Sequence, residues 1–111
     1  MKLPGPDHPI TITPNPGRVR VRLGGQVVAD TTRALRLQEA SYPPVLYLPR
    51  EDADMALLAK SARRTHCPYK GDASYYGADV AWSYEAPFPA VAAIAGHLAF
   101  YPDRVEAIEE S

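Results

Sequence analysis

The alternation of hydrophobic and polar residues predicts short β-strands along most of the chain. Residues 18–23 alternate arginine with valine or leucine, so the apolar side chains share one face of an extended strand. Gly24 and Gly25 then supply the positive φ angles of a two-residue turn, and residues 26–30 return as a second strand. We therefore predict a hairpin with its valines in the core and its arginines in water.

The same pattern predicts further strands and two short helices. The strands are expected over residues 10–13, 33–39, 45–48, 73–76, 80–84 and 97–101, and the helices within residues 53–60, with Asp52 as N-cap, and 90–95. Residues 45–48 are apolar on both faces, which predicts a central strand. The 12 prolines lie mostly between these segments. Because proline is excluded from helix interiors and central strands, every element should be short.

The length and composition are those of one globular domain. The chain has 111 residues, of which 46% are hydrophobic and 23% charged. Residues 1–9 are rich in proline and glycine, so we expect an arm that lies on the surface or is disordered. Residues 10–108 should form a single β-rich domain, with a frayed acidic tail after Ile108. The predicted fold is mainly β, with short antiparallel strands and one or two short helices.

Charge and cysteine content exclude several classes of partner. The net charge of −1 argues against nucleic-acid binding, which needs a clustered excess of basic residues. The longest apolar run, residues 90–95, is far shorter than the ~20 residues of a membrane helix, so no membrane partner is predicted. One cysteine cannot form an internal disulfide, and the first residues lack the apolar stretch of a signal peptide. We expect a cytoplasmic protein.

Reactive side chains are densest in residues 65–76. This stretch contains the single cysteine, Cys67, together with Lys70 and three tyrosines. A turn centred on Pro68 and Tyr69 would bring Lys70 near Cys67, and a neighbouring cation stabilises a thiolate. Cys67 and Lys70 are therefore the candidate catalytic residues, for thiol or group-transfer chemistry. The alternative is that Cys67 is buried and inert.

The aromatic residues suggest a ligand cleft. Tryptophan and tyrosine suit the walls of such a cleft as well as a core. Arg33 shares strand parity with two leucines, so we expect it to point inward and to need a carboxylate or a bound anion. The predicted ligand-binding residues are Arg33, Cys67, Lys70, Tyr75, Trp82 and Tyr84.

Three classes of function stay open. The first hypothesis is a module that binds a small polar or anionic ligand in this cleft. The second is an enzyme that uses Cys67 or Lys70, and the third is an interaction scaffold, for which a homo-oligomer is an open alternative. The three histidines have no metal-ligand spacing, so no metal or other cofactor is predicted.

Five motifs resemble those of the family known as domain of unknown function 427, from small bacterial proteins. They are VADTTRAL at 28–35, YPPVLYLPRED at 42–52, CPYKGDASYY at 67–76, WSYE at 82–85 and IAGHLAFY at 94–101. The resemblance implies a β-tent fold like that of the cereblon thalidomide-binding domain and methionine sulfoxide reductase B. Those relatives usually hold zinc with four cysteines, so a structural zinc is not expected here.

Some members of the family carry a nucleotidyltransferase label. Such enzymes generally need clustered carboxylates for Mg²⁺ and a glycine-rich phosphate loop. The only D-x-D sequence here is formed by Asp52 and Asp54, at the start of a predicted helix where acidic residues suit the helix dipole. The sequence therefore gives this label no support.

Overall fold

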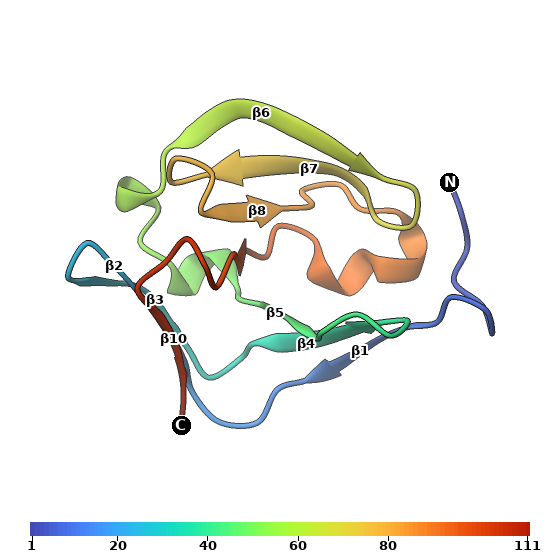
Figure 1. Cartoon of the computed structure of the whole chain (residues 1–111), viewed down its shortest axis with the longest axis horizontal. Helices are drawn as coiled ribbons and strands as arrows, with labels where there is room; N and C mark the ends of the chain where they lie inside the picture. The colour runs from blue at the N-terminus through green and yellow to red at the C-terminus, as the bar shows by residue number, and fades with distance from the viewer.

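Ten short strands form three antiparallel sheets in the computed structural model, which describes residues 1–111 (Figure 1). The first sheet has the order β1 (Ile10–Pro14), β4 (Leu35–Glu39), β5 (Val45–Tyr47). The second has the order β10 (Ala107–Glu110), β2 (Val19–Leu23), β3 (Gln26–Thr31). The third has the order β6 (Lys60–Cys67), β7 (Gly71–Tyr76), β8 (Ala81–Ser83), β9 (Ala99–Phe100). The prediction of a mainly β fold is confirmed.

Three 3₁₀ helices accompany the sheets: η1 (Arg50–Asp52), η2 (Met55–Leu57) and η3 (Pro89–Ile94). Figure 1 shows the four-stranded sheet above the β1-β4-β5 sheet, with η3 between them on the right of the view. The β10-β2-β3 sheet lies on the left. Two groups of buried side chains fill the interior. One lies around β2 and β3, and the other includes Leu37, Tyr47, Tyr75 and Tyr84. No helix is long and apolar enough to cross a membrane.

The hairpin of β2 and β3 has the predicted arrangement. Val19 and Val21 are fully buried, whereas Arg20 and Arg22 are partly exposed. Gly24 and Gly25 have φ angles of 60° and 75°, which fit a two-residue hairpin turn. The alternation of residues 18–23 and the two adjacent glycines were therefore sufficient to predict this hairpin.

Sequence analysis did not predict strand β6. It is the longest strand, with eight residues, and it lies at the edge of its sheet. Its sequence, KSARRTHC, has only two apolar residues, and none of its residues is buried, so it shows no alternation of hydrophobic and polar positions. Its pairing with β7 is also irregular between Lys60 and Arg64. The helix predicted within residues 53–60 is reduced to the single turn η2. Its N-cap is Asp54 rather than Asp52, because the Asp54 side chain accepts a hydrogen bond from the Ala56 amide.

Two other predictions about strands were wrong. β5 lies at an edge of its sheet, and not at the centre. Leu48, the residue after β5, forms a bridge with Leu98 next to the four-stranded sheet, which explains why the segment is apolar on both faces. The acidic tail is not frayed, because β10 pairs with β2 and brings Ile108 opposite Val21.

The first nine residues form an arm that crosses the turn between β6 and β7. The Lys2 amide donates a hydrogen bond of 2.7 Å to the carbonyl of Pro68. The ring of His8 stacks on the ring of Tyr69, with centroids 4.0 Å apart and planes at 8°. The arm is therefore bound to the surface near the stretch that sequence analysis selected as the candidate site.

Candidate functional site

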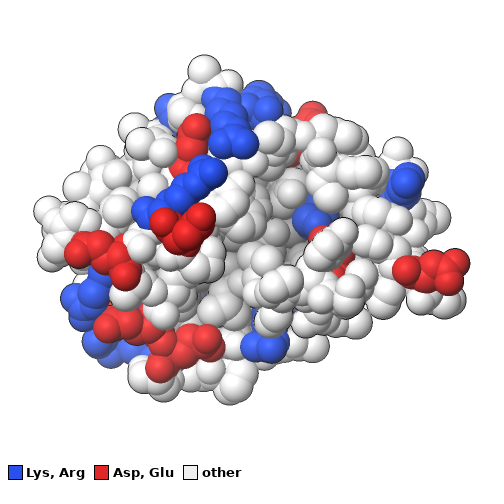
Figure 2. All heavy atoms as spheres, in the orientation of Figure 1, with Lys and Arg blue, Asp and Glu red and all other residues white.

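A pocket of about 220 Å³ lies between the β1-β4-β5 sheet and the four-stranded sheet. We call it the aromatic pocket, and its lining residues are Leu37, Glu39, Tyr42, Pro43, Val45, Tyr47, Lys70, Tyr75, Trp82, Tyr84 and Tyr101. Figure 2 shows one face of the molecule hollowed near its centre, where uncharged atoms predominate, with most charged side chains on the left of the view. The pocket thus has mainly aromatic walls.

Strand pairing brings the aromatic walls together. Tyr75 of β7 lies directly opposite Trp82 of β8, so both rings project from the same face of the sheet. The Trp82 indole meets the Tyr47 ring edge to face, with centroids 6.4 Å apart, and it packs against Tyr101 at 4.4 Å. Aromatic pairs with these geometries hold one another in place. The walls are therefore fixed by contacts between residues of three different elements.

An ion pair between Lys70 and Glu39 closes one end of the pocket. The Nζ atom of Lys70 donates a hydrogen bond to Oε1 of Glu39, and Oε2 of Glu39 lies 2.7 Å from Nε2 of His8. The Lys70 and Glu39 side chains are only 9% and 15% exposed. Lys70 ends the turn after β6, where Gly71 with φ of 109° turns the chain into β7. Glu39 is the last residue of β4.

The neighbours of Glu39 keep its carboxylate charged. Burial alone would raise the pKa of Glu39, but its hydrogen bonds with Lys70 and His8, together with electrostatic attraction, outweigh burial and hold that pKa below its ordinary value. The Lys70 ammonium also lies 5.9 Å from the centre of the Tyr84 ring, where it interacts with the aromatic face. This end of the pocket therefore presents a cation and an anion side by side.

Three phenol groups of the pocket, those of Tyr47, Tyr84 and Tyr101, remain neutral hydrogen-bond donors. Burial raises the pKa values of Tyr47 and Tyr84. Burial and the hydrogen bond with Tyr75 raise the pKa of Tyr101 to about 12. The Tyr84 hydroxyl has no hydrogen-bond partner in the protein, and no fully buried polar side-chain atom lacks one, so this hydroxyl is open to the pocket.

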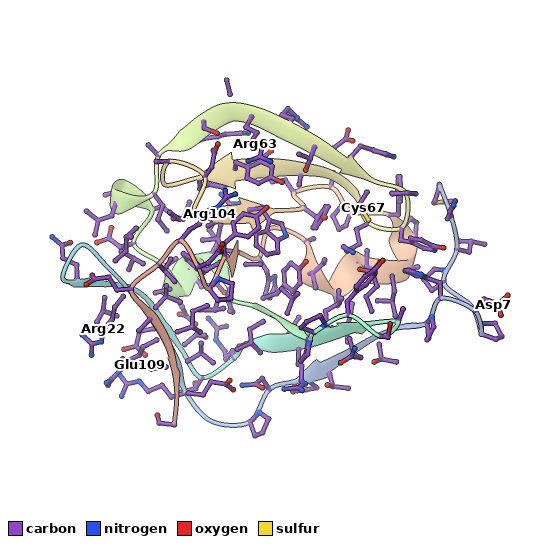
Figure 3. All side chains as sticks on the ribbon, in the orientation of Figure 1. Asp7, Arg22, Arg63, Cys67, Arg104 and Glu109 are labelled. Atoms are coloured by element: carbon purple, nitrogen blue, oxygen red, sulfur yellow. The ribbon has the colours of Figure 1, made fainter.

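Four of the six predicted ligand-binding residues line the aromatic pocket. They are Lys70, Tyr75, Trp82 and Tyr84. Cys67 does not line it. Cys67 is the last residue of β6, and Figure 3 shows it beside the turn into β7. It is partly buried against the group of core side chains that includes Leu37 and Tyr47.

Arg33 lies away from the aromatic pocket, and the prediction that it points inward was wrong. Its side chain is 58% exposed and pairs with Glu51 and Asp52, each at 3.1 Å. β4 begins only at Leu35, so the strand parity that we assigned to Arg33 does not apply. Both carboxylates belong to η1, and they form ordinary exposed salt bridges with Arg33.

The main residue missed from the sequence was Glu39. It has the same strand parity as Leu35 and Leu37, so a signal for an inward carboxylate was present.

The acidic residues Asp52 and Asp54 make contacts within the protein and lie outside the aromatic pocket. Asp52 accepts hydrogen bonds from Thr31 and Arg33, and Asp54 caps η2. No group of three or more histidine, cysteine or acidic residues could hold a metal ion.

The family of the chain follows from comparison with known proteins. No curated protein matches it. The model of the NTP_transf_9 family, described as a domain of unknown function (DUF427), matches residues 11–111. This match covers nearly the whole chain, including every residue that lines the aromatic pocket, and on that basis the chain belongs to the DUF427 family.

Proposed function

We propose that this protein binds a small, polar, ring-bearing molecule in the aromatic pocket. The observation that carries the proposal is the ion pair of Lys70 and Glu39 at one end of an otherwise aromatic cavity. Sites for small molecules are typically apolar clefts with a few converging polar groups. A buried ion pair is weak evidence for stability, because desolvation of both charges offsets their attraction. A role in ligand recognition accounts for its position.

The charge of the site favours a neutral ligand that can both donate and accept hydrogen bonds. Glu39 neutralises Lys70, so a bare anion bound to Lys70 would also lie against the Glu39 carboxylate. A carboxamide or a similar group can accept from Lys70 and donate to Glu39. The Tyr84 hydroxyl supplies a third polar contact, and the rings of Trp82 and Tyr75 supply surfaces for stacking.

Three probes with one shape and different charges test this proposal. Benzamide is neutral, benzoate is an anion and benzamidine is a cation. We expect the largest increase in melting temperature with benzamide. Saturation at about 100 times the dissociation constant should add ~2.7 kcal/mol of stability, which is a shift of several degrees for a domain of this size.

Variants locate the binding site of the probe. Tyr84→Phe removes one hydroxyl, and Lys70→Met removes the cation while it keeps a long apolar stem. Both should reduce the shift caused by benzamide, whereas Arg33→Ala should leave it unchanged because Arg33 lies outside the pocket. A shift that survives both Tyr84→Phe and Lys70→Met would place the bound probe elsewhere and contradict the proposal.

The alternative of an enzyme that uses Cys67 or Lys70 has less support. The Nζ atom of Lys70 is already engaged, because it donates a hydrogen bond to the Glu39 carboxylate. Cys67 lies outside the lining of the pocket. The rate of alkylation by iodoacetamide against pH tests this alternative, because a reactive thiolate would be alkylated rapidly below pH 8.

The third alternative, an interaction scaffold, predicts that light scattering will detect a stable homodimer. We propose the cytoplasm as the location, because the single thiol forms no internal disulfide.

A further inference from the structure

A second pocket, of about 270 Å³, adjoins the aromatic pocket. We call it the apolar pocket, and its lining residues are Val21, Arg36, Pro44, Val45, Leu46, Leu48, Trp82, Phe100, Pro102, Ile108 and Glu110. Val45 and Trp82 line both pockets. The two cavities therefore lie on either side of one indole ring and one valine.

The two pockets differ in chemistry. The inner walls of the apolar pocket are hydrocarbon, and Val21, Leu48 and Phe100 are almost completely buried. Its only charged residues are Arg36 and Glu110, and both are exposed. The aromatic pocket instead offers an ion pair and phenol groups. A ligand that occupied both would need a polar end and an apolar end.

The sizes of the pockets also favour one joint site. Ligand sites in proteins typically have volumes of ≈ 300–1,000 Å³. The pockets have volumes of about 220 Å³ and 270 Å³, so each falls below this range, whereas together they reach roughly 490 Å³. Trp82, which is only half buried, and Val45 divide the two pockets.

We propose that the two pockets form one cleft for a single amphipathic molecule. Its polar ring binds beside Lys70 and Glu39, and its apolar tail passes Trp82 and ends against Leu46 and Ile108 in the apolar pocket. This inference rests on the proposed function, because it uses the aromatic pocket as the site of the polar ring. In Figure 2 the middle of this face is mainly uncharged, and most of the charged side chains lie on the left of the view.

A series of para-alkyl benzamides, from methyl to butyl, tests the inference. Trp82 is the single tryptophan of the chain, so its fluorescence reports binding directly at the boundary of the two pockets. Each methylene that enters the apolar pocket should tighten binding roughly fourfold. The gain should stop when the tail reaches the end of the pocket.

Two variants fill the apolar pocket and leave the aromatic pocket unchanged. Ile108→Phe and Leu46→Phe each enlarge a partly buried residue that lines only the apolar pocket. Both should abolish the gain from longer tails, with the affinity for benzamide unchanged. Val27→Phe is the matched control, because Val27 is exposed on β3 and lines neither pocket. A melting curve for each variant establishes that it folds.

The outcomes separate this inference from the proposed function. If benzamide binds and Lys70→Met weakens it, but longer tails give no gain, the joint cleft is wrong and the proposed function stands. If the gain persists in both Ile108→Phe and Leu46→Phe, the tail lies elsewhere and the inference is again wrong. If benzamide itself does not bind, the proposed function fails, and the inference fails with it.

Discussion

Replacement of Lys70 by methionine tests the ion pair on which the proposed site depends. Methionine retains an unbranched apolar stem that can pack beneath Tyr84, so the main loss is the charge. The Glu39 side chain, which is only 15% exposed in the wild type, is then left with His8 as its only side-chain partner. The substitution therefore leaves a carboxylate in a poorly solvated place without its main counter-charge.

The expected cost follows from the burial of the pair. Removal of one partner from a buried ion pair typically costs ~3–5 kcal/mol, because the remaining charge is uncompensated. His8 still holds one oxygen of Glu39, so we expect the lower end of this range, about 3 kcal/mol. At about 4 °C for each kcal/mol, the melting temperature should fall by roughly 12 °C.

Urea denaturation of four proteins measures this cost and its origin. They are the wild type, Lys70→Met, Glu39→Gln and the double variant, compared at neutral pH. If the interaction is direct, the double variant should be less destabilised than the sum of the single variants by ~2 kcal/mol. A matched control is Lys60→Met, because Lys60 is 50% exposed and its pair with Glu85 at 3.3 Å should contribute no more than ~1 kcal/mol. Equal losses for Lys70→Met and Lys60→Met, or strict additivity in the cycle, would refute the argument.

Three further predictions concern acid, backbone conformation and metals. Because the folded-state pKa of Glu39 is depressed below its ordinary value of 4.5, its contribution to stability is present above pH 4.5 and is lost as pH falls through the folded-state pKa. Thermal melts from pH 6 to pH 2 should thus show a smaller acid-induced loss for Glu39→Gln than for the wild type. Gly17→Ala should lower the urea midpoint more than Gly24→Ala: both glycines have positive φ, but a Cβ at Gly17 would collide with the Ser111 carbonyl, while one at Gly24 meets nothing. Treatment with EDTA should leave the melting temperature unchanged, since the chain has no cluster of metal ligands, and a clear decrease would contradict this.

Sequence reasoning succeeded where the signal was local. The β2–β3 hairpin depends on alternation within a dozen residues and on two adjacent glycines, and both are visible without the rest of the fold. The same holds for Lys70 and Tyr75, which stand out because reactive and aromatic residues are dense around them. Trp82 was found as the single tryptophan on a neighbouring predicted strand.

Sequence reasoning failed where a residue depends on a distant partner. Lys70 and Glu39 are 31 residues apart, and only the packing of two sheets brings them together. Strand β10 needs β2 beside it, and the pair of Arg22 and Glu109 at 2.7 Å joins an N-terminal basic strand to the acidic tail (Figure 3). Arg33 shows the converse error, since one mistaken strand boundary reversed its expected orientation.

The position of β6 has a consequence for how copies of this protein behave at high concentration. As the longest strand and an outer one, it presents unpaired backbone groups along which another chain could add a strand. Lys60, Arg63 and Arg64 place exposed positive charges along it, and the irregular pairing beside them disturbs a flat edge. Two such edges repel one another when they approach. High salt should weaken this repulsion, so β6 is the segment through which we expect concentrated protein to begin to associate.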